Sequence, residues 1–259
     1  MDLQIPEFGV LAAFGLYLVR TSAIVMGAPL LGDGAGFAGY RIALIFGVAI
    51  SLFLATGEPL VGEVPAFEFG LLCLREMLIG IFLAFIAHLV VLAVRVCGEL
   101  IGQEMAFTMA AVVDPATGVR SPLITRFYEV LFFVGLLAVD GHHWLLRALG
   151  ESFHRAPVGG LDFSTNAAFM LQTFLTQMFK AGIVFAAPVM VLLLLVSVLI
   201  GLLARVVPQL NVLEVGFTLR IAVGFGALFI FAPLVAPAMS GLYRNLMSGL
   251  NAGLDVIGS

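Results

Sequence analysis

The stretch Gly98–Pro122 reads GELIGQEMAFTMAAVVDPATGVRSP and lies between two strongly apolar segments of the chain. Gly98 and Gly102 are four residues apart, so on a helix they leave a flat strip against which another backbone can pack. The helix must end by Asp114-Pro115, because proline disfavours the α conformation in the residue before it. The stretch therefore predicts a half-helix that breaks into a loop.

The half-helix carries Met105 and Met109 on one face, since residues four apart are neighbours on a helix surface. In a membrane protein, an apolar half-helix that ends in a loop indicates a re-entrant or gating element. Such backbone is tolerated at membrane depth only where protein buries it or where it lines a cavity. The spacing alone favours the alternative interpretation, an ordinary helix end and connector.

The composition places the chain in a membrane or in a large apolar assembly. Of its 259 residues, 62% are hydrophobic and 11% are charged, and the mean hydropathy is +1.16. Soluble domains are typically about 45–50% apolar and about 25% charged. The net charge is −4 and Lys180 is the only lysine, so we expect no nucleic-acid partner. Cys73 and Cys97 are interpreted as small hydrophobic residues.

Six apolar segments are predicted to be helices, because isolated strands cannot satisfy their backbone groups in lipid. The first segment contains Arg20 and the fourth contains Glu129 and Asp140, and an ionisable group at the bilayer centre costs about 2.5–3.5 kcal/mol. We therefore expect much of this helical surface to be buried against protein, in a single domain over residues 1–259. The segments lie at about 8–31, 42–56, 71–96, 127–146, 181–204 and 221–243.

The sequence Asp140-Gly141-His142-His143 is the most chemically suggestive cluster. A carboxylate beside two imidazoles could bind a metal ion or relay protons. However, neighbouring residues on a helix point about 100° apart, so we expect the two histidines not to share a face. No GxSxG, HExxH or SxxK motif occurs. We therefore predict no enzyme activity, no cofactor and no metal site.

A proline-containing turn follows the most apolar segment. Pro208 ends or kinks that helix, and Gln209 and Asn211 can bond to freed backbone groups or to another chain. Apolar residues then alternate over 213–219 before the last predicted helix. The stretch predicts a hairpin turn between two long helices, which could alternatively serve as a docking tip.

Three blocks of sequence resemble the FliR family, the R component of the flagellar type III export gate, which is related to the T component of injectisomes. Four positions depart from the family pattern. Ala106 stands where the family often has Gly, Leu213 where it has Phe, Thr218 where it has Pro, and Arg220 where it has Lys. The blocks are GELIGQEMA…VVDP (Gly98–Pro115), DGHHWLL (Asp140–Leu146) with ESF…P (Glu151–Pro157), and ARVVPQLNVLEVGFTLR (Ala204–Arg220).

The resemblance implies an all-α integral membrane subunit, made of kinked helical hairpins and built into a helical hetero-oligomer. It implies a non-enzymatic role in the inner membrane, at the flagellar basal body. One copy would complete a pore with about five FliP and four FliQ subunits, near FlhB, for unfolded flagellar proteins. The equivalent injectisome subunit is the related alternative.

The resemblance also assigns residues. Part of Gln103–Pro122 would plug the closed pore, with Gln103, Met105, Phe107, Met109, Asp114 and Pro115 as its main residues. The hairpin tip would contact other subunits through Arg205, Pro208, Gln209, Asn211, Gly216 and Phe217. From a different class of function, the residues also allow a proton-coupled small-molecule carrier that uses Asp140, His142 and Arg20.

Overall fold

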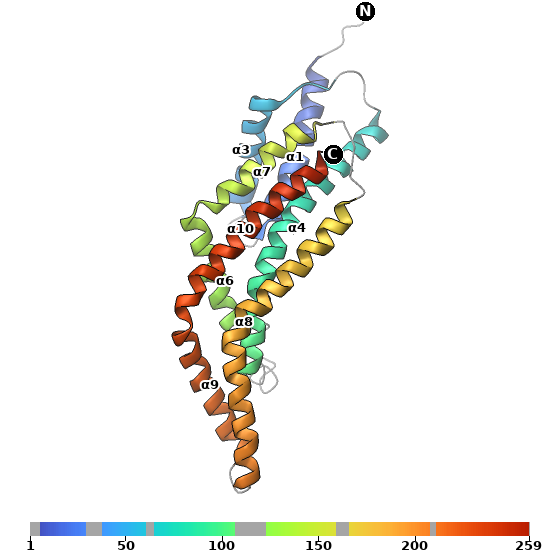
Figure 1. Ribbon diagram of the computed structural model, residues 1–259. Coiled ribbons are helices and arrows are strands. Elements are labelled where there is room, and N and C mark those ends of the chain that lie inside the picture. Colours follow the sequence, from blue (N-terminus) through green and yellow to red (C-terminus); the bar gives the residue numbers. More distant parts are fainter. Residues whose placement is uncertain are drawn as a thin grey trace, which may run out of the picture. The chain divides into compact units, whose positions relative to one another are not determined.

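The computed structural model describes residues 6–29, 38–60, 65–106, 123–158, 166–207 and 211–258, and all regular structure within them is helical. This confirms the all-α fold class. The elements in chain order are α1 Pro6–Gly27, α3 Ala38–Thr56, α4 Ala66–Glu104, α6 Leu123–Ala138, α7 Gly141–Arg155, α8 Ala167–Val206, α9 Val212–Ile230 and α10 Ala232–Ile257 (Figure 1).

The helix predicted over 127–146 is wrong as a single element, because the chain breaks between α6 and α7. Asp140 adopts the left-handed conformation, with φ 56° and ψ 28°, and precedes Gly141. A short polar side chain tolerates this conformation better than an apolar one does. The break ends α6, and α7 then runs from Gly141 to Arg155.

The helix predicted over 221–243 is also divided. It starts earlier, at Val212, and α9 and α10 meet at Phe231 with a bend of 66°. Pro233 explains the break, because it has no N–H to donate to the carbonyl four residues back and it disfavours the α conformation in Ala232. Proline is well tolerated in the first turn of the following helix.

The helices group into two compact units. Unit 1 comprises Met1–Leu89, Asp140–Phe174 and Leu246–Ser259, and unit 2 comprises Val90–Val139 and Leu175–Asn245. The long helices α4, α8 and α10 contribute residues to both units. A single domain over the whole chain stays a prediction.

Unit 1 has a core of apolar side chains and one buried polar cluster. Tyr17 of α1 stacks on Phe153 of α7, with ring centroids 4.0 Å apart, and its hydroxyl donates to the Thr56 carbonyl at the end of α3. α1 therefore contacts α3 and α7 through one side chain. The fully buried apolar side chains of this unit include Leu16, Ile79, Leu83, Ile86 and Leu149.

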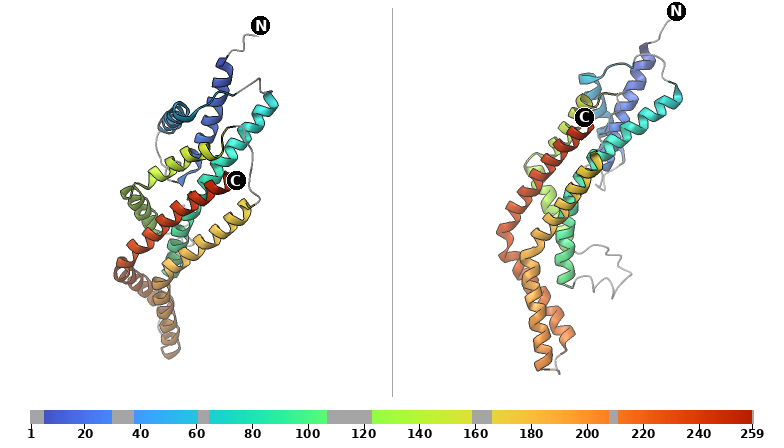
Figure 2. Two further views of the ribbon diagram at one scale, coloured as in Figure 1. Left: turned by 45° about the horizontal axis from the view of Figure 1, so that its top comes forward. Right: turned by 45° about the vertical axis from the view of Figure 1, so that its right-hand side comes forward.

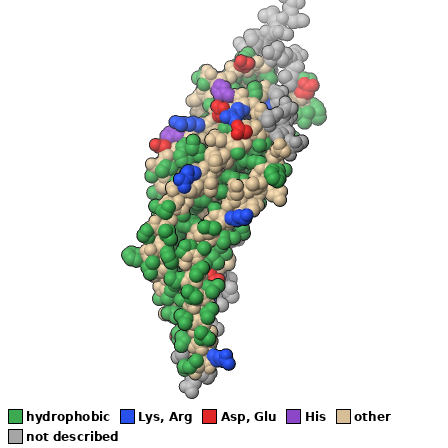
Figure 3. All heavy atoms as spheres, in the orientation of Figure 1, with side chains coloured by type: hydrophobic (Ala, Val, Ile, Leu, Met, Phe, Trp, Pro, Cys, Tyr) green, Lys and Arg blue, Asp and Glu red, His purple; other side chains and the backbone are tan. Residues whose placement is uncertain are grey.

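Unit 2 holds a helical hairpin formed by the C-terminal part of α8 and by α9, which run side by side in all views (Figures 1 and 2). Gly216 of α9 is buried against Ile200 of α8, where a Cβ would lie 3.4 Å from the isoleucine Cγ2. On the face in Figure 3, apolar side chains cover most of these two helices.

Four helices of the described residues are long and apolar enough to cross a membrane, or five if the bent pair of α9 and α10 counts as one span. The chain is therefore a membrane protein, and its candidate spans differ in length, from 18 to 40 residues. The four spans are Gly9–Gly27, Gly39–Thr56, Ala66–Glu104 and Ala167–Val206.

Candidate functional site

The C-terminal end of α4 lies against the backbone of α6. A Cβ on Gly98 would lie 2.4 Å from the Cα of Thr125 and 2.9 Å from its nitrogen. Backbone atoms cannot move aside as a flexible side chain can, so this position requires glycine. The close approach that the glycine spacing predicted is therefore present at Gly98.

Met105 ends this part of the chain in a fully buried position within unit 2. Its side chain lies on Gly224 of α9, where a Cβ would be 2.6 Å from Cε and 2.7 Å from Cγ of the methionine. Ala106 follows in the left-handed conformation, with φ 62°. This fixes the point at which the chain leaves α4. In contrast, Gln103 is exposed.

The other predicted plug residues, Phe107, Met109, Asp114 and Pro115, lie outside the described residues. The structure therefore gives the anchor of the predicted plug but not the plug itself. The plug assignment remains a prediction.

The predicted hairpin tip is partly described. Arg205 at the end of α8 and Asn211 before α9 are exposed, and the Asn211 amide donates to the Glu214 carboxylate at 3.2 Å. Phe217 is 38% exposed, while Gly216 is buried. Pro208 and Gln209 lie outside the described residues. The alternating apolar residues before Arg220 belong to α9, so expecting them in a turn was wrong.

A buried charge cluster ties three helices of unit 1 together, and sequence reasoning found only one member. Arg20 of α1 donates through Nε to Glu76 Oε2 of α4 at 2.5 Å. Its other nitrogens donate to the carbonyls of Ser152 and Ala156 at 2.8 and 2.9 Å. The guanidinium also lies 4.1 Å from the Phe153 ring centroid. Arg20 thereby supplies a donor to the Ala156 carbonyl just after α7, whereas the Ser152 carbonyl also accepts from the Ala156 N–H.

Arg75 completes the cluster. Its Nη1 donates to Glu76 Oε1 and to the Pro157 carbonyl, each at 3.2 Å. The Glu76 carboxylate thus accepts from two guanidinium groups at zero exposure. Arg20 and Glu76 are 56 residues apart, so their pairing leaves no local signal in the sequence.

The residues Asp140, His142 and His143 come closer together than helix geometry suggested. The imidazole centroids of His142 and His143 lie 4.1 Å apart. The atoms of all three residues that could bind a metal ion lie within 4.8 Å of one another. The angle of about 100° between neighbouring residues of a helix describes the directions of their Cβ atoms. The imidazole rings extend beyond Cβ, so at the start of a helix they can still approach each other. Asp140 is largely exposed, with a side-chain exposure of 77%. Arg20 does not join this group.

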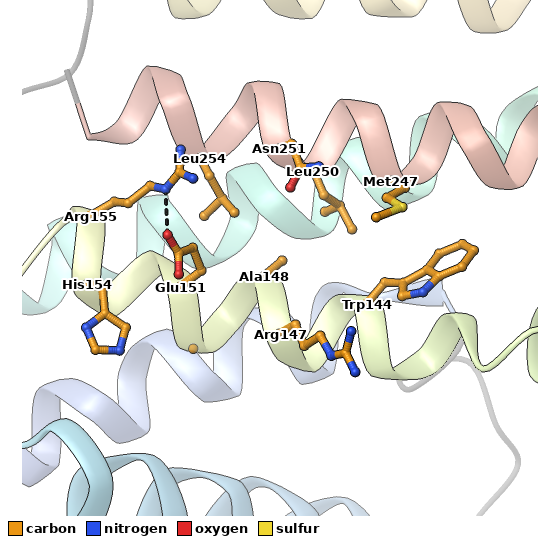
Figure 4. A pocket seen from close by; sticks show the side chains of 11 residues that line it. Trp144, Arg147, Ala148, Glu151, His154, Arg155, Met247, Leu250, Asn251 and Leu254 are labelled. Atoms are coloured by element: carbon orange, nitrogen blue, oxygen red, sulfur yellow. Dashed lines mark hydrogen bonds and ion pairs between the residues drawn. The ribbon is translucent and has the colours of Figure 1, made fainter.

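A groove of about 480 Å³ runs between α7 and the C-terminal part of α10, both in unit 1 (Figure 4). Ala148, Leu250 and Leu254 supply apolar surface. At one end, Arg155 is paired with Glu151 at 2.9 Å and with Asp255. The hydrogen bonds to Glu151 and then to Asp255 raise the pKa of Arg155. These ion pairs leave the groove without a strong net charge.

Comparison with known proteins finds relatives that are flagellar biosynthetic proteins or a related surface presentation protein. A family model described as "Bacterial export proteins, family 1" matches residues 11–246. The chain is 33% identical to the flagellar biosynthetic protein FliR of Escherichia coli (strain K12), over 98% of this chain and 100% of that protein. It is 33% identical to FliR of Bacillus subtilis (strain 168), over 95% and 96%. It is 28% identical to the surface presentation of antigens protein SpaR of Shigella flexneri, over 82% and 81%.

Proposed function

Because the chain belongs to the bacterial export proteins of family 1, we propose that it is a non-enzymatic subunit of the flagellar type III export gate. The observation that carries this proposal is the similarity to FliR proteins over nearly the whole length of both chains. The injectisome relative is similar at lower identity and coverage, which favours the flagellar form.

In this proposal, one copy completes a pore in the inner membrane with about five FliP and four FliQ subunits, beside FlhB. Unfolded flagellar proteins pass through it. The many exposed apolar side chains of the helices fit a chain that is covered by lipid and by other subunits, because large exposed apolar patches mark membrane or protein contacts.

The segment Gln103–Pro122 is proposed to plug the closed pore. Its anchor supports this role, since Met105 is held on Gly224 and Ala106 after it adopts the left-handed conformation. Methionine is an adaptable apolar residue, so Met109 beyond the anchor can help to seal a lumen and then repack around many substrates.

The test deletes Gln103–Pro122 from the chain in a bacterium that lacks its own copy of this subunit. We expect the closed gate to leak small ions while the mutant chain still copurifies with FliP and FliQ. A gate that stays tight after the deletion removes the plug assignment. A full-length chain that never copurifies with these subunits refutes the proposed function itself.

The carrier alternative is tested by Asp140→Asn. A proton-coupled carrier predicts that this change abolishes transport while assembly stays normal. The export-gate proposal predicts little effect, because asparagine also tolerates the left-handed conformation at this position. The carrier also loses support because Arg20, one of its proposed residues, is fully buried and paired with Glu76.

A further inference from the structure

Three side chains of metal-binding type lie together at the start of α7, and we call them the Asp140 cluster. The cluster consists of Asp140, His142 and His143, all within unit 1. Its carboxylate and imidazole atoms that could bind a metal ion lie within 4.8 Å of one another. Imidazole nitrogens suit Zn²⁺, Cu²⁺ and Ni²⁺, whereas Mg²⁺ and Ca²⁺ prefer oxygen ligands. Two imidazoles beside one carboxylate therefore form a ligand set for an ion of the zinc type.

The spacing of Asp140 and His143 fits a shared ion better than a direct contact. Asp140 Oδ1 lies 3.6 Å from His143 Nδ1, which is too long for a hydrogen bond. Two ligand atoms that each lie about 2.0–2.1 Å from a tetrahedral Zn²⁺ ion are about 3.4 Å apart. The two side chains thus already stand at nearly the separation that one ion requires. The backbone holds them there, since the His143 N–H donates to the Asp140 carbonyl at 3.0 Å.

His142 can supply the third ligand. Its Nδ1 is buried and has no hydrogen-bond partner among the described residues. A buried polar atom that lacks a partner costs about 1–3 kcal/mol, and a metal ion on this nitrogen would remove that cost. The ring itself is partly exposed, so it can rotate. Moving its nitrogen by about 1–1.5 Å closes the gap from 4.8 Å to the ligand separation of a zinc site.

The charges around the Asp140 cluster limit its affinity. The N-terminal end of α7 carries a partial positive charge, which opposes a bound cation. The Asp140 carboxylate offsets this charge, and its exposure of 77% lets an ion reach it from solvent. Arg147 lies one turn after His143 and is exposed, so salt screens its charge. We therefore expect an ion that exchanges with solution.

We propose that the Asp140 cluster binds one Zn²⁺ ion through Asp140, His142 and His143, with water in the remaining position. The expectation of no metal site rested on two imidazoles that point apart, and their centroid separation of 4.1 Å removes that reason. The ion joins the residue before α7 to the first turn of the helix. Because it binds the folded chain, it stabilises the fold in proportion to its concentration. This inference is independent of the proposed function.

Equilibrium dialysis of the purified full-length chain against zinc chloride tests the site. We expect about one zinc ion per chain. His142→Gln with His143→Gln removes two ligands and should weaken binding at least tenfold, because even the loss of an outer-shell contact costs about 10–100-fold. His154→Gln is the matched control, since His154 is an exposed histidine of the same helix. An equal loss of zinc in both variants, or no zinc on the unmodified chain, overturns the inference.

Trp144 gives a second measurement, because it is the only tryptophan of the chain and directly follows His143. Co²⁺ in the site should quench Trp144 fluorescence, since paramagnetic ions quench a neighbouring indole. Zn²⁺ should displace Co²⁺ and restore the fluorescence, whereas Mg²⁺ should not. Asp140→Asn keeps a residue that tolerates the left-handed conformation, and it should weaken Co²⁺ binding roughly tenfold. Quenching that Mg²⁺ also reverses, or that Asp140→Asn leaves unchanged, refutes the site.

Discussion

The Nε of Arg20 on α1 lies 2.5 Å from Oε2 of Glu76 on α4, and neither side chain is exposed to solvent. The same carboxylate accepts from Arg75, and the two arginines also donate to carbonyls at the end of α7. A charge in the middle of an apolar helix is thus satisfied inside the protein. This explains how α1 can be apolar enough for a span and still contain an arginine.

Glu76→Gln should be strongly destabilising. It leaves two buried guanidinium groups without their carboxylate, and breaking a buried ion pair typically costs about 3–5 kcal/mol. The measurement is the thermal unfolding midpoint of the purified assembly, together with the amount of chain recovered. Glu68→Gln is the control, because Glu68 lies on the same helix and is exposed. Equal stability of the two variants would show that the cluster contributes little.

Gly98→Ala and Gly70→Ala should change stability in opposite directions, although both glycines lie in α4. A Cβ at position 98 would meet the Thr125 backbone at 2.4 Å, whereas nothing lies within 4 Å of a Cβ at position 70. Alanine in an open helical position is favoured by about 0.5–1 kcal/mol over glycine. The thermal unfolding midpoints of the two variants show whether each substitution raises or lowers the stability. A stabilising Gly98→Ala would contradict the close approach of the Gly98 and Thr125 backbones.

The sequence predicted the helices well where the physical signal was local. Long apolar runs and the need to satisfy the backbone in lipid were sufficient for the all-α fold. The break at Asp140 was missed although the polar run Asp140-Gly141-His142-His143 lies there, because apolar residues on both sides of it were joined into one segment. The break at Phe231 was missed because an apolar window continues across it. Pro233 did carry a signal for the second break, since it cannot donate to a preceding carbonyl.

The candidate site was less predictable because its contacts are tertiary. Glu76 is 56 residues from Arg20, and Gly224 is far from Met105 in the sequence. No spacing rule connects such pairs. The glycine at position 98 was found because its requirement for a close backbone is visible in the Gly98–Gly102 spacing alone.

Ala106→Gly should stabilise the chain. Ala106 has φ 62°, and a left-handed conformation costs a residue with a Cβ about 1–2 kcal/mol, a cost that glycine avoids. Ala222→Gly is the matched control, because Ala222 is exposed within α9 and glycine there should destabilise the helix by about 1 kcal/mol. Opposite shifts of the unfolding midpoint are expected. A destabilising Ala106→Gly would argue against the left-handed turn.

Gly224→Ala should destabilise the end of α4, and Met105→Ala should partly rescue it. A Cβ at position 224 would lie 2.6–2.8 Å from three atoms of the Met105 side chain, which is fully buried and cannot simply turn into solvent. Shortening the methionine leaves a cavity, which the added methyl group partly fills. The double variant should therefore be more stable than the sum of the single effects predicts, by about 0.5–3 kcal/mol.

Gly226→Ala is the control for this cycle, because the same helix leaves its Cβ without a neighbour within 4 Å. It should show no coupling to Met105→Ala. The three single variants and the two double variants with Met105→Ala are compared by unfolding of the purified assembly and by ion leakage of the gate. If the anchor holds the plug in place, Gly224→Ala increases leakage and Gly226→Ala does not. Additive stabilities in the cycle would show that the two residues are not in contact.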